Sequence, residues 1–219
     1  EHASKSYSVE MNSPVLEYED IPLLQEVVRA LRRAGGVTGP RYCAGTHIHI
    51  SADDYTSQQI RNLVNIFASK ENFLWDALQV SSARESYCHK MDKQFIEEIK
   101  KLWYRGRMSE QFQHYSNSRY VICNLHSFFQ HGHYEIRAYN GSLHAGEVRS
   151  QIVLALAISN AAMTKKYCSP HVSHHLKSAW HVLKKSHLLL SGSRFCLFFQ
   201  KESHRVRLPV KRWNGLNSA

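Results

Sequence analysis

Residues 45–51 read Gly45-Thr46-His47-Ile48-His49-Ile50-Ser51, so isoleucine alternates with polar and titratable residues. In a β-strand, side chains two residues apart point to the same face of the sheet. The alternation therefore predicts a strand over residues 42–51. Its apolar side would carry Ile48 and Ile50, and its other side would carry both histidines.

A second segment, residues 133–140, shows the same division. Glu135 and Arg137 would lie on one face of a strand together with Tyr139, while Ile136 and Ala138 would lie on the other. A third strand is predicted from Tyr7 to Met11. Its polar side would carry Glu10, with Ser8 and Asn12 two residues away on either side.

The residue types on these polar faces indicate a particular chemistry. Carboxylates and imidazoles close together suit a divalent cation, and Mg²⁺ is usually held by one or two carboxylates plus substrate phosphates. An arginine beside them matches the fork geometry of a phosphate or carboxylate. The residues alone thus favour a metal- and anion-binding face on an antiparallel sheet, although an ordinary solvent-exposed face is the alternative for any single strand.

Helices are expected between the strands. Asp20 followed by Pro22 predicts a helix that ends at Gly35, and Thr56 with Gln59 forms a capping-box pattern before the next helix. Further helices are expected over residues 146–163 and 177–190, and a strand over Arg119–Leu125 is expected to join residues 133–140 through a short turn. Uneven alternation of helices with an antiparallel hairpin indicates an α+β fold with helices on one face of the sheet.

Composition narrows the class of protein. The 219 residues are 43% hydrophobic and 21% charged, values typical of a folded globular chain. The longest apolar run, Ile152–Ile158, is far shorter than a membrane span, and no leader sequence is visible. Five cysteines without a C-x-x-C spacing favour a reducing, cytoplasmic location over a disulfide framework.

The charge is concentrated at one end of the chain. The net charge is +10, and residues 165–219 hold eleven Lys and Arg residues but one acid, Glu202. We expect these residues to form a basic C-terminal helical extension of a single domain spanning residues 1–219. Such a segment could meet nucleic acid or another polyanion, or it could simply be a solvated basic face.

Several segments, in order along the chain, resemble the amidoligases, which belong to the carboxylate–amine ligase superfamily with glutamine synthetase and γ-glutamylcysteine synthetase. The matching segments are Val9–Leu16, Cys43–Ile50, Arg84–Cys88, Arg119–Tyr120, Asn124–His126, Glu135–Gly146 and Leu190–Phe195. The resemblance implies a curved antiparallel sheet of the glutamine-synthetase type with helices on one face. It also implies ATP-dependent joining of a carboxylate to an amine through an acyl phosphate, with ATP and Mg²⁺ or Mn²⁺ bound.

The resemblance also supplies positions for site residues. The candidate metal ligands are Glu10, His47 and Glu135. ATP phosphates or the acyl phosphate would be bound by Arg84 and Arg137, with His49 as a further cofactor-binding residue. Arg119 would bind the substrate carboxylate. The catalytic set is then Glu135, Arg137 and Arg119, and the substrates are small-molecule or peptide carboxylates and amines.

The sequence also departs from the family pattern. A strand bearing Glu-x-Glu normally precedes the segment that begins at Val9, and only eight residues stand before it here. We therefore expect a sheet that lacks its first strand and a chain that is poorly active by itself. Two alternatives to the ligase stay open: a non-catalytic or truncated relative that binds peptide, and a polyanion or nucleic-acid binder that uses the basic end.

Overall fold

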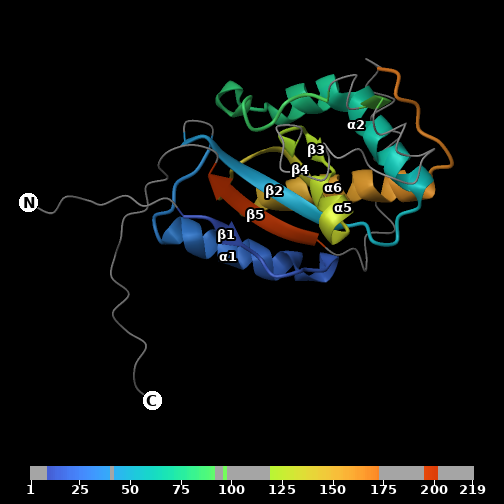
Figure 1. Cartoon of the computed structure of the whole chain (residues 1–219). Helices are drawn as coiled ribbons and strands as arrows, with labels where there is room; N and C mark the ends of the chain where they lie inside the picture. The colour runs from blue at the N-terminus through green and yellow to red at the C-terminus, as the bar shows by residue number, and fades with distance from the viewer. Residues whose placement is uncertain (1–8, 40–41, 92–95, 98–118, 173–194, 202–219) are drawn as a thin grey trace, which may run out of the picture.

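The computed structural model describes residues 9–39, 42–91, 96–97, 119–172 and 195–201, which form one antiparallel sheet packed against helices (Figure 1). The strand order in the sheet is β1-β5-β2-β4-β3. Three strands are longer, namely β2 (Ala44–Ser51), β4 (His133–Asn140) and β5 (Phe195–Lys201). The outer strands β1 (Met11–Asn12) and β3 (Cys123–Asn124) have two residues each. The predicted α+β class with an antiparallel sheet is confirmed.

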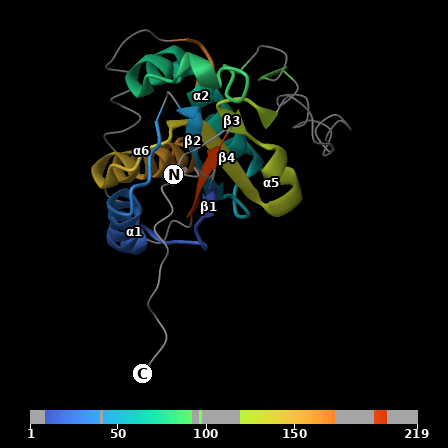
Figure 2. The same ribbon diagram turned by 90° about the vertical axis from the view of Figure 1, so that its left-hand side faces the viewer.

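The helices of the described chain are α1 (Ile21–Arg33), α2 (Ser57–Leu78), α5 (His126–His131) and α6 (Ala145–Thr164), with one-turn helices η1 (Tyr18–Asp20) and η3 (Ser82–Arg84). Helix α6 crosses one face of the sheet (Figure 2). Both α1 and α2 pack against α6, at different places along it. These helices bury the apolar face of the sheet.

The helix boundaries follow the predicted signals. Helix α1 has Pro22 in its first turn and ends before Gly35, which adopts a positive φ of 87°. The capping box before α2 is complete: the Thr56 hydroxyl accepts a hydrogen bond from the Gln59 amide, and the Gln59 side chain accepts one from the Thr56 amide at 2.7 Å. Each bond satisfies a backbone donor that the helix geometry leaves unpaired.

The core lies between the sheet and α2 and α6. Ile48 and Ile50 of β2 are buried there, and so are Ile136 and Ala138 of β4. In the register of the two strands, Ile48 lies opposite Ile136 and His49 lies opposite Glu135. The predicted division of these strands into an apolar face and a titratable face is confirmed at these positions.

Tyr139 does not follow the predicted division. The register between β2 and β4 is irregular between Thr46 and Ile48, so that Tyr139 lies opposite Thr46. An irregularity of this kind shifts the alternation of side chains by one residue. Tyr139 is consequently 1% exposed and belongs to the hydrophobic core instead of sharing a face with Glu135.

Three expectations need correction: the length of one strand, the short turn after it and the helical structure of the C-terminal extension. The strand expected over Arg119–Leu125 is shortened to β3, and helix α5 separates it from β4 in place of a short turn. The extension expected to be helical contains a strand, β5, which pairs with both β1 and β2. The apolar run Phe195–Phe199 between polar neighbours is typical of a short buried strand. The helix expected over residues 177–190 lies outside the described residues.

Candidate active site

Glu135 lies at the centre of a group of polar side chains on the face of the sheet opposite α6. Its Oε1 atom lies 2.9 Å from His47 Nδ1 and 2.8 Å from Arg137 Nη1, while its Oε2 atom accepts a hydrogen bond of 2.7 Å from Asn124 Nδ2. His49 Nε2 is 3.6 Å from the same Oε1 atom. These five residues, which we call the Glu135 cluster, come from β2, β3 and β4.

The carboxylate of Glu135 stays ionised although it is buried. Burial by itself would raise its pKa, but the hydrogen bond from His47 and the charge of Arg137 hold the pKa well below its ordinary value. An ionised carboxylate only accepts hydrogen bonds, so the Nδ1 atom of His47 carries the proton between the two groups.

His49 stays neutral near pH 7. Burial lowers the pKa of its imidazole to about 4, although the Glu135 carboxylate acts in the opposite direction. Its ring packs against that of His133, with 4.9 Å between the centroids. The Glu135 cluster therefore combines one carboxylate and one guanidinium with a neutral imidazole.

Arg137 is held in place from three sides. Besides its bond to Glu135, its Nε atom donates a hydrogen bond of 3.0 Å to the carbonyl oxygen of Tyr87, and its guanidinium lies 5.4 Å from the centre of the Tyr120 ring. Arg119 stacks on the same ring at 4.6 Å and is hydrogen-bonded to the Tyr120 hydroxyl. Two arginines thus flank one half-buried tyrosine beside the cluster, an arrangement suited to an anionic ligand.

Arg84 is fully buried next to the cluster. Its Nη1 atom donates to the carbonyl oxygen of Tyr139 at 2.6 Å, and its Nη2 atom donates to that of Arg137 at 2.8 Å. The Arg84 guanidinium fits there because Gly45 of β2, the strand next to β4, has no side chain. These bonds anchor η3 to β4 where the register is irregular.

Four of the predicted site residues come together in the Glu135 cluster: Glu135, Arg137, His47 and His49. Arg119 and Arg84 lie beside it. Glu10 is exposed and precedes β1, and both β5 and β2 separate β1 from β4. No hydrogen bond or ion pair between described residues joins Glu10 to the cluster.

Sequence reasoning missed Asn124 as a site residue. Its side chain donates to Glu135 and accepts a hydrogen bond of 2.9 Å from the His126 amide, which fixes the orientation of the amide group. The sequence did contain a signal for a site residue here, because Asn124–His126 is one of the segments that resemble the amidoligases. A two-residue strand is too short for alternation to place its side chains on a face.

The donor set does not form a metal cage by itself. Among the described residues, no group of three or more His, Cys, Asp or Glu side chains is arranged to hold a metal ion. Asn124 is the one described donor to Glu135 Oε2, and a carboxylate oxygen can accept more than one contact. A hard cation such as Mg²⁺ fits this oxygen only where phosphate and water complete its coordination.

Residues 1–159 match a protein-family model described as "Putative amidoligase enzyme". The chain belongs to this amidoligase family. The matched range contains every member of the Glu135 cluster. No match to the chain was found among curated proteins or among solved structures. None of the described helices is long and apolar enough to cross a membrane.

Proposed function

We propose that this amidoligase joins a carboxylate to an amine in an ATP-dependent reaction, with the Glu135 cluster as its active site on a glutamine-synthetase-like sheet. The observation that carries the proposal is the buried, ionised Glu135 beside Arg137 and His47. A buried charge is expensive unless it is paired, and a site that keeps a carboxylate and a guanidinium together suits a reaction that moves phosphoryl charge.

In the proposed reaction, an oxygen of the substrate carboxylate attacks the γ-phosphorus of ATP, and the bond to the β,γ-bridging oxygen breaks to release ADP. The amine nitrogen then attacks the acyl carbon of the resulting acyl phosphate. The carbon–oxygen bond to phosphate breaks, inorganic phosphate leaves, and the nitrogen loses a proton as the amide forms. Most of the catalytic effect would come from positioning and from neutralisation of phosphate charge.

Four side chains have roles in this proposal. Glu135 would hold Mg²⁺ or Mn²⁺ on the ATP phosphates, and the ion would neutralise charge on the transferred group. Arg137 would bind a phosphoryl oxygen, and Arg119 would bind the substrate carboxylate. His47 orients Glu135 through the Nδ1 contact. Arg84 is left out of this set, because it already donates to two backbone carbonyls.

The test is release of ADP by the whole protein with Mg²⁺ and a panel of paired carboxylic acids and amines. Glu135→Gln should lower turnover by about 10²–10³-fold, as is common when a group that stabilises transition-state charge is removed. The matched control is Glu85→Gln, because Glu85 is exposed and lies outside the cluster. Equal turnover by Glu135→Gln and wild type would refute the active-site assignment.

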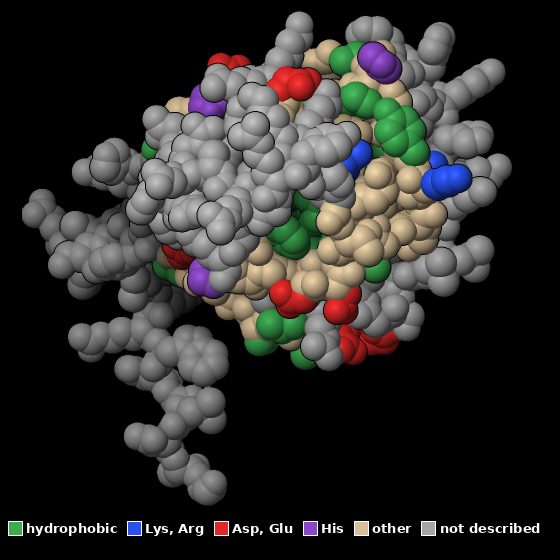
Figure 3. All heavy atoms as spheres, turned by 45° about the vertical axis from the view of Figure 1, so that its right-hand side comes forward, with side chains coloured by type: hydrophobic (Ala, Val, Ile, Leu, Met, Phe, Trp, Pro, Cys, Tyr) green, Lys and Arg blue, Asp and Glu red, His purple; other side chains and the backbone are tan. Residues whose placement is uncertain are grey.

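Complete absence of ADP release with every pair would favour the non-catalytic alternative. The polyanion-binding alternative depends on residues 165–219, most of which lie outside the described part of the chain. On the face shown in Figure 3, the described acidic and basic side chains lie in small separate groups, without a continuous basic surface formed by described residues. Salt-sensitive binding to DNA tests that alternative.

A further inference from the structure

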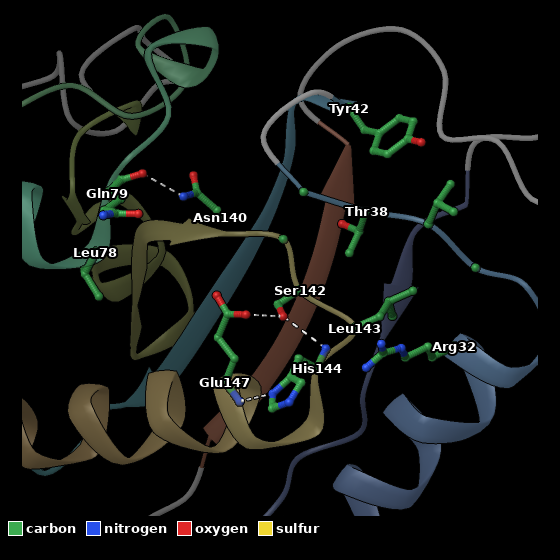
Figure 4. Close-up of a pocket in the computed structure, with 14 residues that line it drawn as sticks. Arg32, Thr38, Tyr42, Leu78, Gln79, Asn140, Ser142, Leu143, His144 and Glu147 are labelled. Carbon is green, nitrogen blue, oxygen red and sulfur yellow. Dashed lines mark hydrogen bonds between the residues drawn. The ribbon is translucent and has the colours of Figure 1, made fainter.

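A pocket of about 670 Å³ lies outside the Glu135 cluster, between α1, α2 and α6 (Figure 4). Its walls are the C-terminal turn of α1 with residues 36–39, the last turn of α2, residues 140–144 after β4, and the first turn of α6. The volume lies in the range of pockets that bind small molecules. No residue of the Glu135 cluster lines it.

One wall of the pocket is held rigidly by Asn140. Its Oδ1 atom accepts a hydrogen bond of 3.1 Å from the Ser81 amide, and its Nδ2 atom donates one of 2.8 Å to the carbonyl oxygen of Gln79. The carbonyl oxygen of Asn140 accepts a hydrogen bond from Gln151 Nε2 at 3.2 Å. Because these bonds join the end of β4 to the segment after α2 and to α6, this wall of the pocket is held in place by the protein itself.

The N-terminus of α6 is already capped by the protein. The Glu147 amide donates to His144 Nδ1 at 3.2 Å, the Ser142 hydroxyl donates to Glu147 Oε2 at 2.6 Å, and the His144 amide donates to the Ser142 hydroxyl at 3.0 Å. Because the Glu147 and His144 amides already donate hydrogen bonds within the protein, they are not available to bind an anion in the pocket.

The pocket instead presents one positive and one negative side chain. Arg32 lies in the last turn of α1 and lines the pocket, and its exposed guanidinium makes no hydrogen bond or ion pair with another described residue. Glu147 Oε1 likewise has no described partner, although Oε2 accepts from Ser142. Val37, Leu78 and Leu143 add apolar surface between these charged groups.

We infer that this pocket binds an amino acid or short peptide with free termini, pairing its carboxylate with Arg32 and its ammonium with Glu147. Opposite charges on separate walls favour a ligand that carries both charges, since a ligand with one charge gains one of the two charge contacts and not the other. The hydroxyl of Thr38 supplies a further polar contact along the ligand. This inference goes beyond the ligase activity and does not depend on ATP.

The experiment measures binding by calorimetry in the absence of ATP, with trialanine, N-acetyl-trialanine and trialanine amide as probes. The wild-type protein should bind trialanine at least tenfold more tightly than either blocked peptide. Arg32→Gln should bind trialanine and its amide equally, and Glu147→Gln should bind trialanine and its N-acetyl form equally. The Gln variant of Glu147 keeps an oxygen that can accept from Ser142.

The controls are Arg33→Gln, which changes the neighbouring exposed arginine, and Glu26→Gln on the exposed side of α1. Both should keep the wild-type preference, and thermal melts should show all variants folded. Equal affinity of the wild-type protein for all three probes, or no binding at millimolar peptide, overturns the inference. Either outcome leaves the ADP-release test of the ligase unaffected, so the two proposals fail separately.

Discussion

The guanidinium of Arg84 lies against Gly45 so closely that a β-carbon on residue 45 would be 2.4 Å from Arg84 Nη2. Arg84 belongs to η3 and Gly45 to β2, so the contact joins segments far apart in the sequence. The absence of a side chain at residue 45 is what allows the arginine to reach the carbonyl groups of β4. The geometry of the Glu135 cluster therefore depends on a residue that has no functional group.

Gly45→Ala should lower the free energy of unfolding by roughly 1–3 kcal/mol, the usual cost of overpacking a dense interior. The added methyl group would displace the Arg84 guanidinium, which is buried and has little room to move. Chemical denaturation measures the change. Gly146→Ala is the control, because its new methyl group would meet only the exposed His144 ring, at 3.1 Å, and alanine favours the helical backbone of α6, so this variant should be no less stable than the wild type.

Arg84→Lys should also destabilise the fold, although the positive charge is kept. A lysine ammonium cannot donate along the fork that reaches both Tyr139 and Arg137, and each buried carbonyl left unpaired costs about 1–3 kcal/mol. The matched control is Arg29→Lys on the exposed part of α1, where the change should be below about 0.5 kcal/mol. Equal stability of the two variants in denaturation would contradict the structural role of Arg84.

Ile136→Asp should leave no folded protein at room temperature. Ile136 is fully buried in the hydrophobic core, and an aspartate there would be a buried charge without a partner. Circular dichroism and melting curves measure the loss. Ser51→Asp should fold normally, because Ser51 is exposed at the end of β2. A folded Ile136→Asp variant would show that the apolar face is wrongly placed.

Glu71 should make stability depend on pH. Burial raises the pKa of its carboxyl from 4.5 to about 7, so the folded state binds this proton more tightly than the unfolded state. The stabilisation is fully present below pH 4.5, falls as the pH rises, and is lost above about 7. Glu71→Gln should remove this dependence, since its amide oxygen can still accept from the Met91 amide.

Melting temperatures of both proteins between pH 4.5 and 8 measure the effect. The Gln variant should gain on the wild-type protein as the pH rises and should be the more stable of the two at pH 8. A constant difference across that range would mean that Glu71 titrates at its ordinary value. The attraction of Lys90 exists only for the ionised carboxylate of the wild-type protein and lowers its pKa, so it opposes the gain of the variant and cannot imitate it.

Local patterns predicted most of the longer elements. The boundaries of β4 match the alternation over residues 133–140, and α2 begins where Thr56 and Gln59 form the capping box. These signals work because each depends on neighbouring residues only. The same patterns predicted that His47 and Glu135 would occupy the polar face, although strand pairing itself could not be read from either strand.

Contacts between distant segments could not be predicted in this way. Nothing in the local pattern shows that Arg84 would donate to β4 carbonyls, because that depends on the loop between α2 and β3 returning to the sheet. The position of Glu10 depends likewise on β5 entering the sheet between β1 and β2. Tyr139 was assigned to the wrong face because one register irregularity reverses the alternation after it.

Strand β5 is also the last of the described elements to be synthesised, because it comes last in the sequence. Before Phe195–Lys201 emerges, β2 would have β4 on one side and an unpaired edge on the other. Exposed strand edges pair readily with other chains, and contacts between residues far apart in sequence form slowly. A nascent chain would therefore carry this open edge until residues 195–201 had been made, and chaperone demand during expression should fall only after β5 has formed.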